Sequence, residues 1–217
     1  MLRYKITVLF ILLISICTFN FVEAGTNELP LLGKVIYLDP GHGGLDPGAM
    51  YKNIKEKNIN LQISKNLEKR LTKLGAIVYL TRYDDYDLSV NNTINRKRSD
   101  LSRRGNIINK SDCDLFLSIH LNAENTGIWK GAQTFYNTNN KENKKIAELL
   151  QQQFKEDLNS KRKAKNKNDL YLQKRINRPG VLIEVGFLSN ASERYLLKQE
   201  KYQDKVTLSI ANALLKY

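Results

Sequence analysis

The chain contains 217 residues, 41% of them hydrophobic, which suits one domain with a single sizeable core. Lysine and arginine number 35 against 22 acidic residues, and the formal net charge of +13 favours polyanionic surroundings. Because the chain has only two cysteines, a fold held together by several disulfides is excluded.

The first 24 residues have the features of an export signal. Two basic residues precede an almost unbroken apolar run over 6–17, and the segment ends in the small residue Ala24. An uncleaved membrane anchor is the alternative, but the apolar run is shorter than the roughly 20 residues that a membrane span requires. We expect a cleaved signal peptide at 1–24, a short extension at 25–33 and one folded domain at 34–217.

Export limits the partners of this basic chain. Cleavage would leave Cys113 as the single cysteine of the mature chain, so no intramolecular disulfide can form, which suits the bacterial cell envelope. Nucleic acid is the usual partner of a strongly basic protein, but export argues against it and favours anionic wall polymers. Contact with a membrane is expected through the signal segment only.

From residue 34 onward, strand-like and helix-like segments alternate without a linker or an internal repeat. Apolar runs of the kind that is buried on both faces predict strands at 34–38, 77–81, 115–119, 133–136 and 181–185. Helical periodicity predicts helices at 56–74, 94–109 and 141–158, and a last helix from Asn190 to Tyr217. We expect a single α/β domain with a mostly parallel, twisted sheet of about five to six strands and helices on both faces.

Two basic segments are predicted to lie in solvent. The helix at 94–109 carries five arginines and lysines, which most simply form a solvated face. The stretch 159–168 carries five more and has no apolar residue larger than Ala164, so we expect an exposed loop there. For this loop, contact with a polyanion is the alternative.

The chain has only two histidines, and each follows a predicted strand. His42 comes after the stretch 35–41, and His120 comes after the run 115–119. Ligand crevices in open α/β sheets form at the carboxyl ends of the strands, and histidine is the commonest metal ligand in proteins. Two unrelated histidines, one in a turn and one capping a strand, are the alternative, so the surrounding residues must decide.

Glu56 is the candidate third ligand. It begins the helix at 56–74, where complementing the helix dipole is a sufficient structural role. The loop 43–49, however, is rich in residues that let the chain turn sharply, and it can return Glu56 to His42. Two histidines and one glutamate match catalytic zinc with a fourth position open for water. We expect one zinc ion per chain at the carboxyl ends of the strands.

Glu184 is the candidate base for the zinc-activated water. It is a charged residue within the apolar stretch 180–187, where an acid without a partner is costly. A side chain that points to solvent or pairs with an arginine is the alternative. Zinc hydrolysis requires a base that lies near the metal without being a ligand, and we expect Glu184 to fill that role.

Four ordered segments carry a resemblance to a known family. They are the stretches 35–44, 56–61, 118–123 and 183–190. Through them the chain resembles the zinc-dependent N-acetylmuramoyl-L-alanine amidases (amidase type 3 family) from about residue 34 to residue 217. The stretches 81–88 and 96–101 are further similar to the germination-specific, spore-cortex branch of that family.

The resemblance implies an activity and its residues. Zinc would bind His42, Glu56 and His120, and Glu184 would be the catalytic acid. The substrate would be peptidoglycan glycan strands with stem peptides, cleaved at the amide between the lactyl group of N-acetylmuramic acid and L-alanine. Glu184 would take the water proton and return it to the departing alanine nitrogen. The enzyme would be exported to the cell envelope, in the forespore intermembrane space or the spore cortex.

Three further residues have roles that the sequence leaves open. Asn122 either donates to substrate or forms a turn, and Arg82 either meets a stem-peptide carboxylate or forms a structural salt bridge. Asp39 is a candidate to orient its neighbours, since carboxylates near metal sites commonly fix ligating histidines.

Two other functions use the same residues. A zinc peptidase acting on wall peptides would need the same ligand types, and its products would distinguish it. A wall-binding regulatory protein without activity is the second alternative, although an intact Glu184 speaks against it. Two of the three expected ligands are neutral, so the zinc affinity would be modest. A partner protein that orders the site or targets the enzyme is therefore compatible with the sequence.

Overall fold

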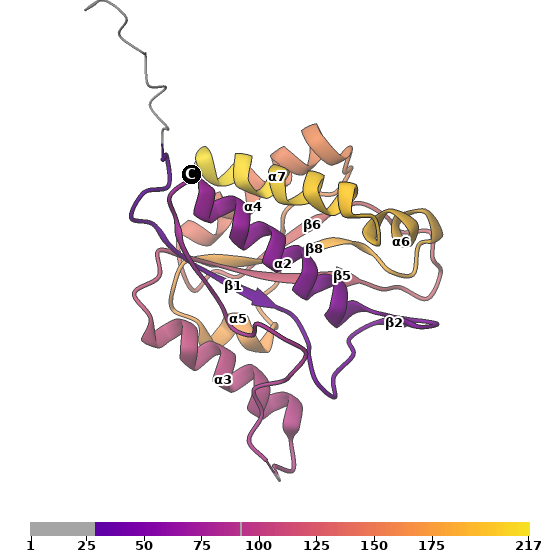
Figure 1. Ribbon diagram of the computed structural model, residues 1–217, viewed down its shortest axis with the longest axis horizontal. Helices are drawn as coiled ribbons and strands as arrows, with labels where there is room; N and C mark the ends of the chain where they lie inside the picture. Colours follow the sequence, from indigo (N-terminus) through magenta and orange to yellow (C-terminus); the bar gives the residue numbers. More distant parts are fainter. Residues whose placement is uncertain (1–28, 92) are drawn as a thin grey trace, which may run out of the picture.

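The computed structural model describes residues 29–91 and 93–217 (Figure 1). The signal peptide expected at 1–24 and residues 25–28 of the extension expected at 25–33 lie outside these residues, so both stay predictions. None of the described helices is long and apolar enough to cross a membrane.

A six-stranded sheet forms the centre of the molecule, in the order β4-β1-β5-β8-β6-β7. Its strands are β1 (Val35–Pro40), β4 (Ile77–Leu80), β5 (Leu115–Asn122), β6 (Gln133–Tyr136), β7 (Lys165–Asn166) and β8 (Gly180–Phe187). The strands β4, β1, β5 and β8 are parallel, whereas β6 pairs antiparallel with β8 and parallel with β7. A separate hairpin consists of β2 (Met50–Tyr51) and β3 (Ile54–Lys55). The predicted, mostly parallel sheet is confirmed.

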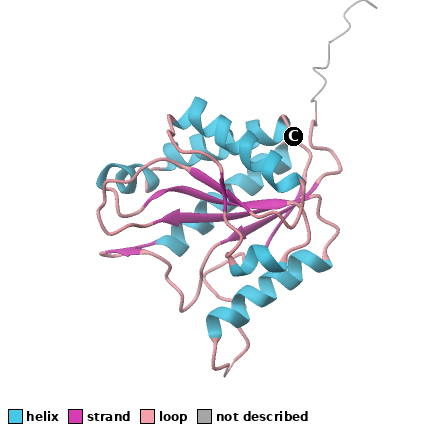
Figure 2. Ribbon diagram, turned by 180° about the vertical axis from the view of Figure 1, so that it is seen from behind, coloured by secondary structure: helices cyan, strands magenta, loops and turns pink. Residues whose placement is uncertain are grey.

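Helices cover both faces of the sheet, as predicted (Figures 1 and 2). On one face lie α2 (Glu56–Lys73), α4 (Glu142–Leu158) and α7 (Glu200–Leu215), and α7 packs against both α2 and α4. On the other face lie α3 (Arg96–Lys110) and α5 (Tyr171–Arg175). The short helix α6 (Ala191–Leu197) follows β8. The expected single α/β domain is therefore observed.

Alternating side chains of β5 divide the core into two parts. Leu117 is buried in the larger cluster, to which α2, α4 and α7 contribute. Phe116 belongs to a smaller cluster with Ile108 of α3 and Leu172 of α5. Because successive side chains in a strand point to opposite faces, His120 shares the face of Phe116. This is the face on which α3 and α5 lie.

Three element boundaries differ from the predictions. β5 continues to Asn122, so His120 lies within the strand and not beyond it, because the backbone there still pairs with β8. The C-terminal segment forms two helices, since the extended backbone of Gln199 (ψ 126°) separates α6 from α7. The loop at 159–168 includes β7, whose backbone pairs with β6.

Candidate metal centre

His42, Glu56 and His120 converge from three separate elements. His42 follows β1, Glu56 opens α2, and His120 lies in β5. The oxygen Oε1 of Glu56 lies 3.2 Å from Nε2 of His42 and 3.1 Å from Nδ1 of His120. Ligand atoms of all three residues lie within 4.8 Å of one another. The structure thus brings together the three residues that the sequence singled out, and together they could hold a metal ion.

The carboxylate of Glu56 is held in place as an ionised acceptor. Its Oε1 accepts hydrogen bonds from the amide of Leu121 at 2.9 Å and from the side chain of Asn60 at 3.1 Å. Its Oε2 accepts one from the amide of Ala49 at 2.8 Å. Burial would raise the pKa of this carboxyl, but hydrogen bonds with the two histidines outweigh burial and hold the pKa well below its usual range. One anionic oxygen facing two imidazole nitrogens fits the donor set of catalytic zinc.

Two glycines allow the ligands to approach one another. A Cβ on Gly41 would lie 2.2 Å from Cε1 of His120. A Cβ on Gly48, whose φ is 66°, would lie 2.5 Å from Oε2 of Glu56 and 2.7 Å from Cδ2 of His42. A side chain at either position would displace one of the three converging residues, so both positions require glycine.

The backbone of His42 is in the left-handed region, with φ of 62°, which is uncommon for a residue with a side chain. Arg104 donates hydrogen bonds to the carbonyl oxygens of His42 at 2.7 Å and Pro40 at 2.8 Å. Arg82 donates to the carbonyl oxygens of Pro40 at 2.9 Å and Gly41 at 3.0 Å. Two guanidinium groups therefore bind three successive carbonyls and hold the backbone that presents His42.

Arg82 and Arg104 correct two predictions. Arg82 is 0% exposed and donates to backbone carbonyls, so it is not open to substrate, and it forms no salt bridge among the described residues. Arg104, which the sequence placed on a solvated helix face, is 1% exposed and pairs with Asp39 and Asp100, each at 2.9 Å. The reason is the same for both arginines. Buried carbonyls after β1 need donors, and one guanidinium group satisfies several of them.

Asp46, and not Asp39, contacts the ring of His42. Oδ2 of Asp46 lies 2.8 Å from Nδ1 of His42, which leaves Nε2 of the same ring facing Glu56. Asp39 instead accepts hydrogen bonds from three side chains, those of Thr81, Ser118 and Arg104. Asp39 therefore does not contact a histidine ring, but it holds Arg104, which binds the carbonyl oxygen of His42. A signal for Asp46 was present in the sequence, since it is the acid in the loop that directly follows His42.

Glu184 lies beside the three converging residues. It is on β8 and is the register partner of His120 on β5. Its Oε2 is buried and has no hydrogen-bond partner among the described residues, so the pairing with an arginine considered from the sequence is not observed. Burial raises the pKa of Glu184 to about 7, and the charge of Glu56 acts in the same direction. A carboxyl group with this pKa can accept and donate a proton near neutral pH.

A cavity of about 1030 Å³ opens beside Glu184. Its lining includes Leu182 of β8, Gln133 and Phe135 of β6, and much of the segment between α4 and α5. Asn122, for which the sequence left a substrate contact open, borders the same space. A substrate lying in this cavity would thus reach Glu184.

Comparison with known proteins decides the family. The model of the N-acetylmuramoyl-L-alanine amidase family matches residues 36–216. The chain belongs to the N-acetylmuramoyl-L-alanine amidase family. This confirms the expected enzyme class and makes peptidoglycan the class of substrate.

Two amidases of Bacillus subtilis (strain 168) are similar to the chain. The germination-specific N-acetylmuramoyl-L-alanine amidase is 43% identical over 215 residues, which cover 96% of this chain and 91% of the relative. The N-acetylmuramoyl-L-alanine amidase LytC is 33% identical over 88% of this chain but only 37% of its own length. The resemblance to the germination-specific branch of the family is therefore confirmed.

Solved amidase structures share the fold. The CwlD amidase from Clostridioides difficile, in complex with the GerS lipoprotein, is 40% identical with a TM-score of 0.80 over 85% of this chain and 98% of its own. An N-acetylmuramoyl-L-alanine amidase from Clostridium difficile 630 is 33% identical with a TM-score of 0.76 over 85% and 96%. These likenesses confirm the predicted fold class.

Proposed function

We propose that this amidase cleaves the bond between the lactyl group of N-acetylmuramic acid and L-alanine, using one zinc ion on His42, Glu56 and His120. Glu184 acts as the general base and then as the general acid. The observation that carries the proposal is the buried oxygen of Glu184, which has no hydrogen-bond partner among the described residues and lies beside the three converging residues His42, Glu56 and His120. Two imidazole nitrogens and one ionised carboxylate leave a fourth position open, as catalytic zinc requires.

The chemistry divides between the metal and the chain. When bound, zinc would polarise the scissile carbonyl and acidify water. Glu184 accepts a proton from the attacking water, because a pKa of about 7 leaves a large fraction of the carboxyl ionised at neutral pH. The same carboxyl then donates this proton to the alanine nitrogen, which leaves as an amine. Without protonation, that nitrogen would be a very poor leaving group.

Other residues position the reacting groups. Asp46 holds the ring of His42 through Nδ1 and so keeps Nε2 directed at the metal position. Asn122 borders the cavity beside Glu184, and its amide can donate a hydrogen bond to the substrate. Neither residue transfers a proton, and both reduce the freedom of the reacting groups.

The biological setting is part of the proposal. Similarity to the germination-specific amidase over 96% of the chain supports a role in processing spore-cortex peptidoglycan. Such a role requires export to the cell envelope, which the features of residues 1–24 and the positive charge also favour. The complex of the CwlD amidase with the GerS lipoprotein supports a partner protein that orders or targets this chain as well.

Product analysis tests the proposed function. Purified peptidoglycan is incubated with the enzyme, with and without a chelator, and the muropeptides are identified by mass spectrometry. We expect new free L-alanine amino termini and intact glycan strands, which the chelator abolishes and added zinc restores. Shortened peptides that keep the lactyl amide would instead make the protein a peptidase. Binding without any cleavage in the presence of zinc would make it a regulatory protein.

A further inference from the structure

The cavity beside Glu184 has a basic wall. Six cationic side chains line the cavity, and they belong to Lys161, Arg162, Lys163, Lys165, Lys167 and Lys174. Three acidic side chains line it as well, Glu184 among them. Five of the six cations come from one short segment between α4 and α5. Like charges this close repel one another, so an anion in the cavity would be bound favourably.

The sheet register places the wall across from Glu184. Glu184 of β8 is the register partner of Gln133 of β6, and Phe135 of β6 is the register partner of Lys165 of β7. The side chain of Gln133 also donates to the carbonyl oxygen of Lys163 at 2.9 Å. Two strand spacings, about 10 Å, therefore separate the backbone of Glu184 from that of the wall. An extended peptide spans this distance with about three residues.

One part of the wall is fixed by contacts, and another part makes no ion pair with the residues that the structure describes. Arg162 donates to Gln133 at 3.1 Å, and its guanidinium lies 5.1 Å from the ring centre of Trp129 and 5.2 Å from that of Phe187. The ion pairs that lysines make among the described residues involve neither Lys163 nor Lys165. Both of these lysines are exposed on the wall of the cavity. Their ammonium groups are thus available to a ligand.

Substrate chemistry indicates which ligand this is. On the glycan side of the scissile bond, the lactyl carboxyl group is consumed in the amide itself, so no charge remains near Glu184. On the peptide side, a stem peptide presents free carboxylates within a few residues of its alanine. An ammonium group binds a carboxylate through a charge-assisted hydrogen bond. The basic wall therefore matches the peptide side of the substrate.

We propose that Lys163 and Lys165 bind a free carboxylate of the stem peptide and so make the enzyme select acidic stem peptides over amidated ones. This inference rests on the proposed function, because it places the scissile amide at Glu184. An extended anionic polymer is the other ligand that a basic surface could take. The position of the wall inside a cavity that reaches Glu184, between amide and apolar side chains, favours the peptide.

Two N-acetylmuramoyl tripeptides test the proposal. They differ in one group, which is either the free α-carboxylate of the second residue or its carboxamide. We expect the wild-type enzyme to favour the acid by about tenfold in kcat/KM, mostly through KM, which is the effect of one charge-assisted hydrogen bond. The double variant Lys163→Gln/Lys165→Gln should lose this preference by binding the acid more weakly. The variant Lys163→Arg/Lys165→Arg should retain it.

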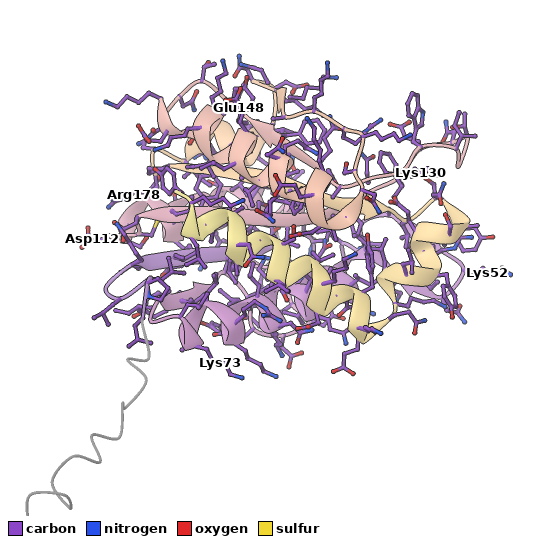
Figure 3. All side chains as sticks on the ribbon, turned by 90° about the horizontal axis from the view of Figure 1, so that it is seen from above. Lys52, Lys73, Asp112, Lys130, Glu148 and Arg178 are labelled. Atoms are coloured by element: carbon purple, nitrogen blue, oxygen red, sulfur yellow. The ribbon has the colours of Figure 1, made fainter. Side chains whose placement is uncertain are left out.

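A matched control removes the same charge elsewhere. Lys69 and Lys73 lie on α2, on the other face of the sheet, and Lys73 projects from the surface (Figure 3). The variant Lys69→Gln/Lys73→Gln should keep the full preference for the acid. Equal use of both substrates by the wild type overturns the proposal, as does an equal loss on both substrates in Lys163→Gln/Lys165→Gln.

A binding measurement separates this proposal from the proposed function. Calorimetry with the Glu184→Gln variant reports affinity for the two tripeptides without turnover, so a preference for the acid supports the wall even if neither peptide is hydrolysed. Absence of hydrolysis by the wild type would count against the proposed function instead. If Glu184→Gln binds purified wall only while anionic polymers are still attached, the ligand is the polymer and the proposal is overturned.

Discussion

Arg104 and His42 are joined by a hydrogen bond of 2.7 Å from the guanidinium group to the carbonyl oxygen, although 62 positions separate them in the chain. Arg104 is itself fixed by ion pairs with Asp39 and Asp100. The left-handed backbone of His42 is therefore held by a helix that contributes no ligand. Residues that position the metal site thus lie outside the four segments that carry the family resemblance.

Replacing Arg104 by methionine should destabilise the fold and loosen the site. The change leaves Asp39 buried without its charged partner, which costs about 3–5 kcal/mol of unfolding free energy. Urea unfolding measures this loss, and the zinc content after dialysis measures the effect on the site. The control Arg103→Met changes an exposed neighbour on the same helix and should stay within about 0.5 kcal/mol. An unaltered midpoint in Arg104→Met would contradict the structural role.

Gly41→Ala should lower zinc affinity. The added Cβ would lie 2.2 Å from the ring of His120, so the ring must move away from Glu56. Metal content after dialysis against a graded series of chelator concentrations reports the change. Gly105→Ala is the matched control, because a Cβ there meets its nearest neighbour at an ordinary 3.5 Å. The prediction fails if both alanine variants retain zinc as the wild type does.

Asp46→Asn should weaken zinc binding by about 10- to 100-fold, the usual effect of losing a carboxylate behind a ligating histidine. In the wild type, Oδ2 of Asp46 lies 2.8 Å from Nδ1 of His42. The variant replaces this charged carboxylate with a neutral amide. Competition with a coloured zinc chelator measures the affinity. Asp84→Asn, in an exposed loop, supplies a control of equal charge change. Equal affinities in the two variants would show that Asp46 does not orient the ligand.

Glu184→Gln should lower turnover by about 10²- to 10⁴-fold while zinc still binds, because the amide cannot accept the water proton. Zinc content and the rate of muropeptide release are measured on the same preparation. Loss of zinc together with activity would instead make Glu184 a ligand. Normal turnover in the variant would exclude the proposed proton transfer.

Glu184 should also make metal-free stability depend on pH. Burial raises the pKa of this carboxyl from 4.5 to about 7, so the folded state binds its proton more tightly than the unfolded state does. The stability that this proton contributes is fully present below about pH 4.5 and is lost as the pH rises through about 7. Glu184→Gln should therefore become more stable than the wild type over this range, by about 3 kcal/mol. Urea unfolding with chelator at several pH values measures the difference, and a difference that is constant with pH would contradict the prediction.

Local patterns were sufficient to predict the fold and to select the three residues that converge in the structure. Apolar strand segments alternate along the chain with helical segments such as the amphipathic helix at 56–74, and this order predicts an α/β fold. Each type of element can be recognised because its buried residues recur with a characteristic period. His42, Glu56 and His120 could be selected because each lies next to the end of a predicted element. Glu184 could be selected because burying an acid within an apolar strand costs free energy unless the acid has a partner or a function.

Only the tertiary structure decided which charged residues are buried and what they contact. Arg104 resembles its exposed neighbours in sequence, and it is buried because carbonyls far away in the chain face it. Asp39 and Asp46 are both acids close to His42, and the turn between β1 and α2 determines which one reaches the ring. The basic segment at 159–168 becomes one wall of a cavity only because β7 pairs with β6. The sequence itself shows which residues are charged. The partner of each charged residue, in contrast, depends on contacts between segments that are distant in the chain.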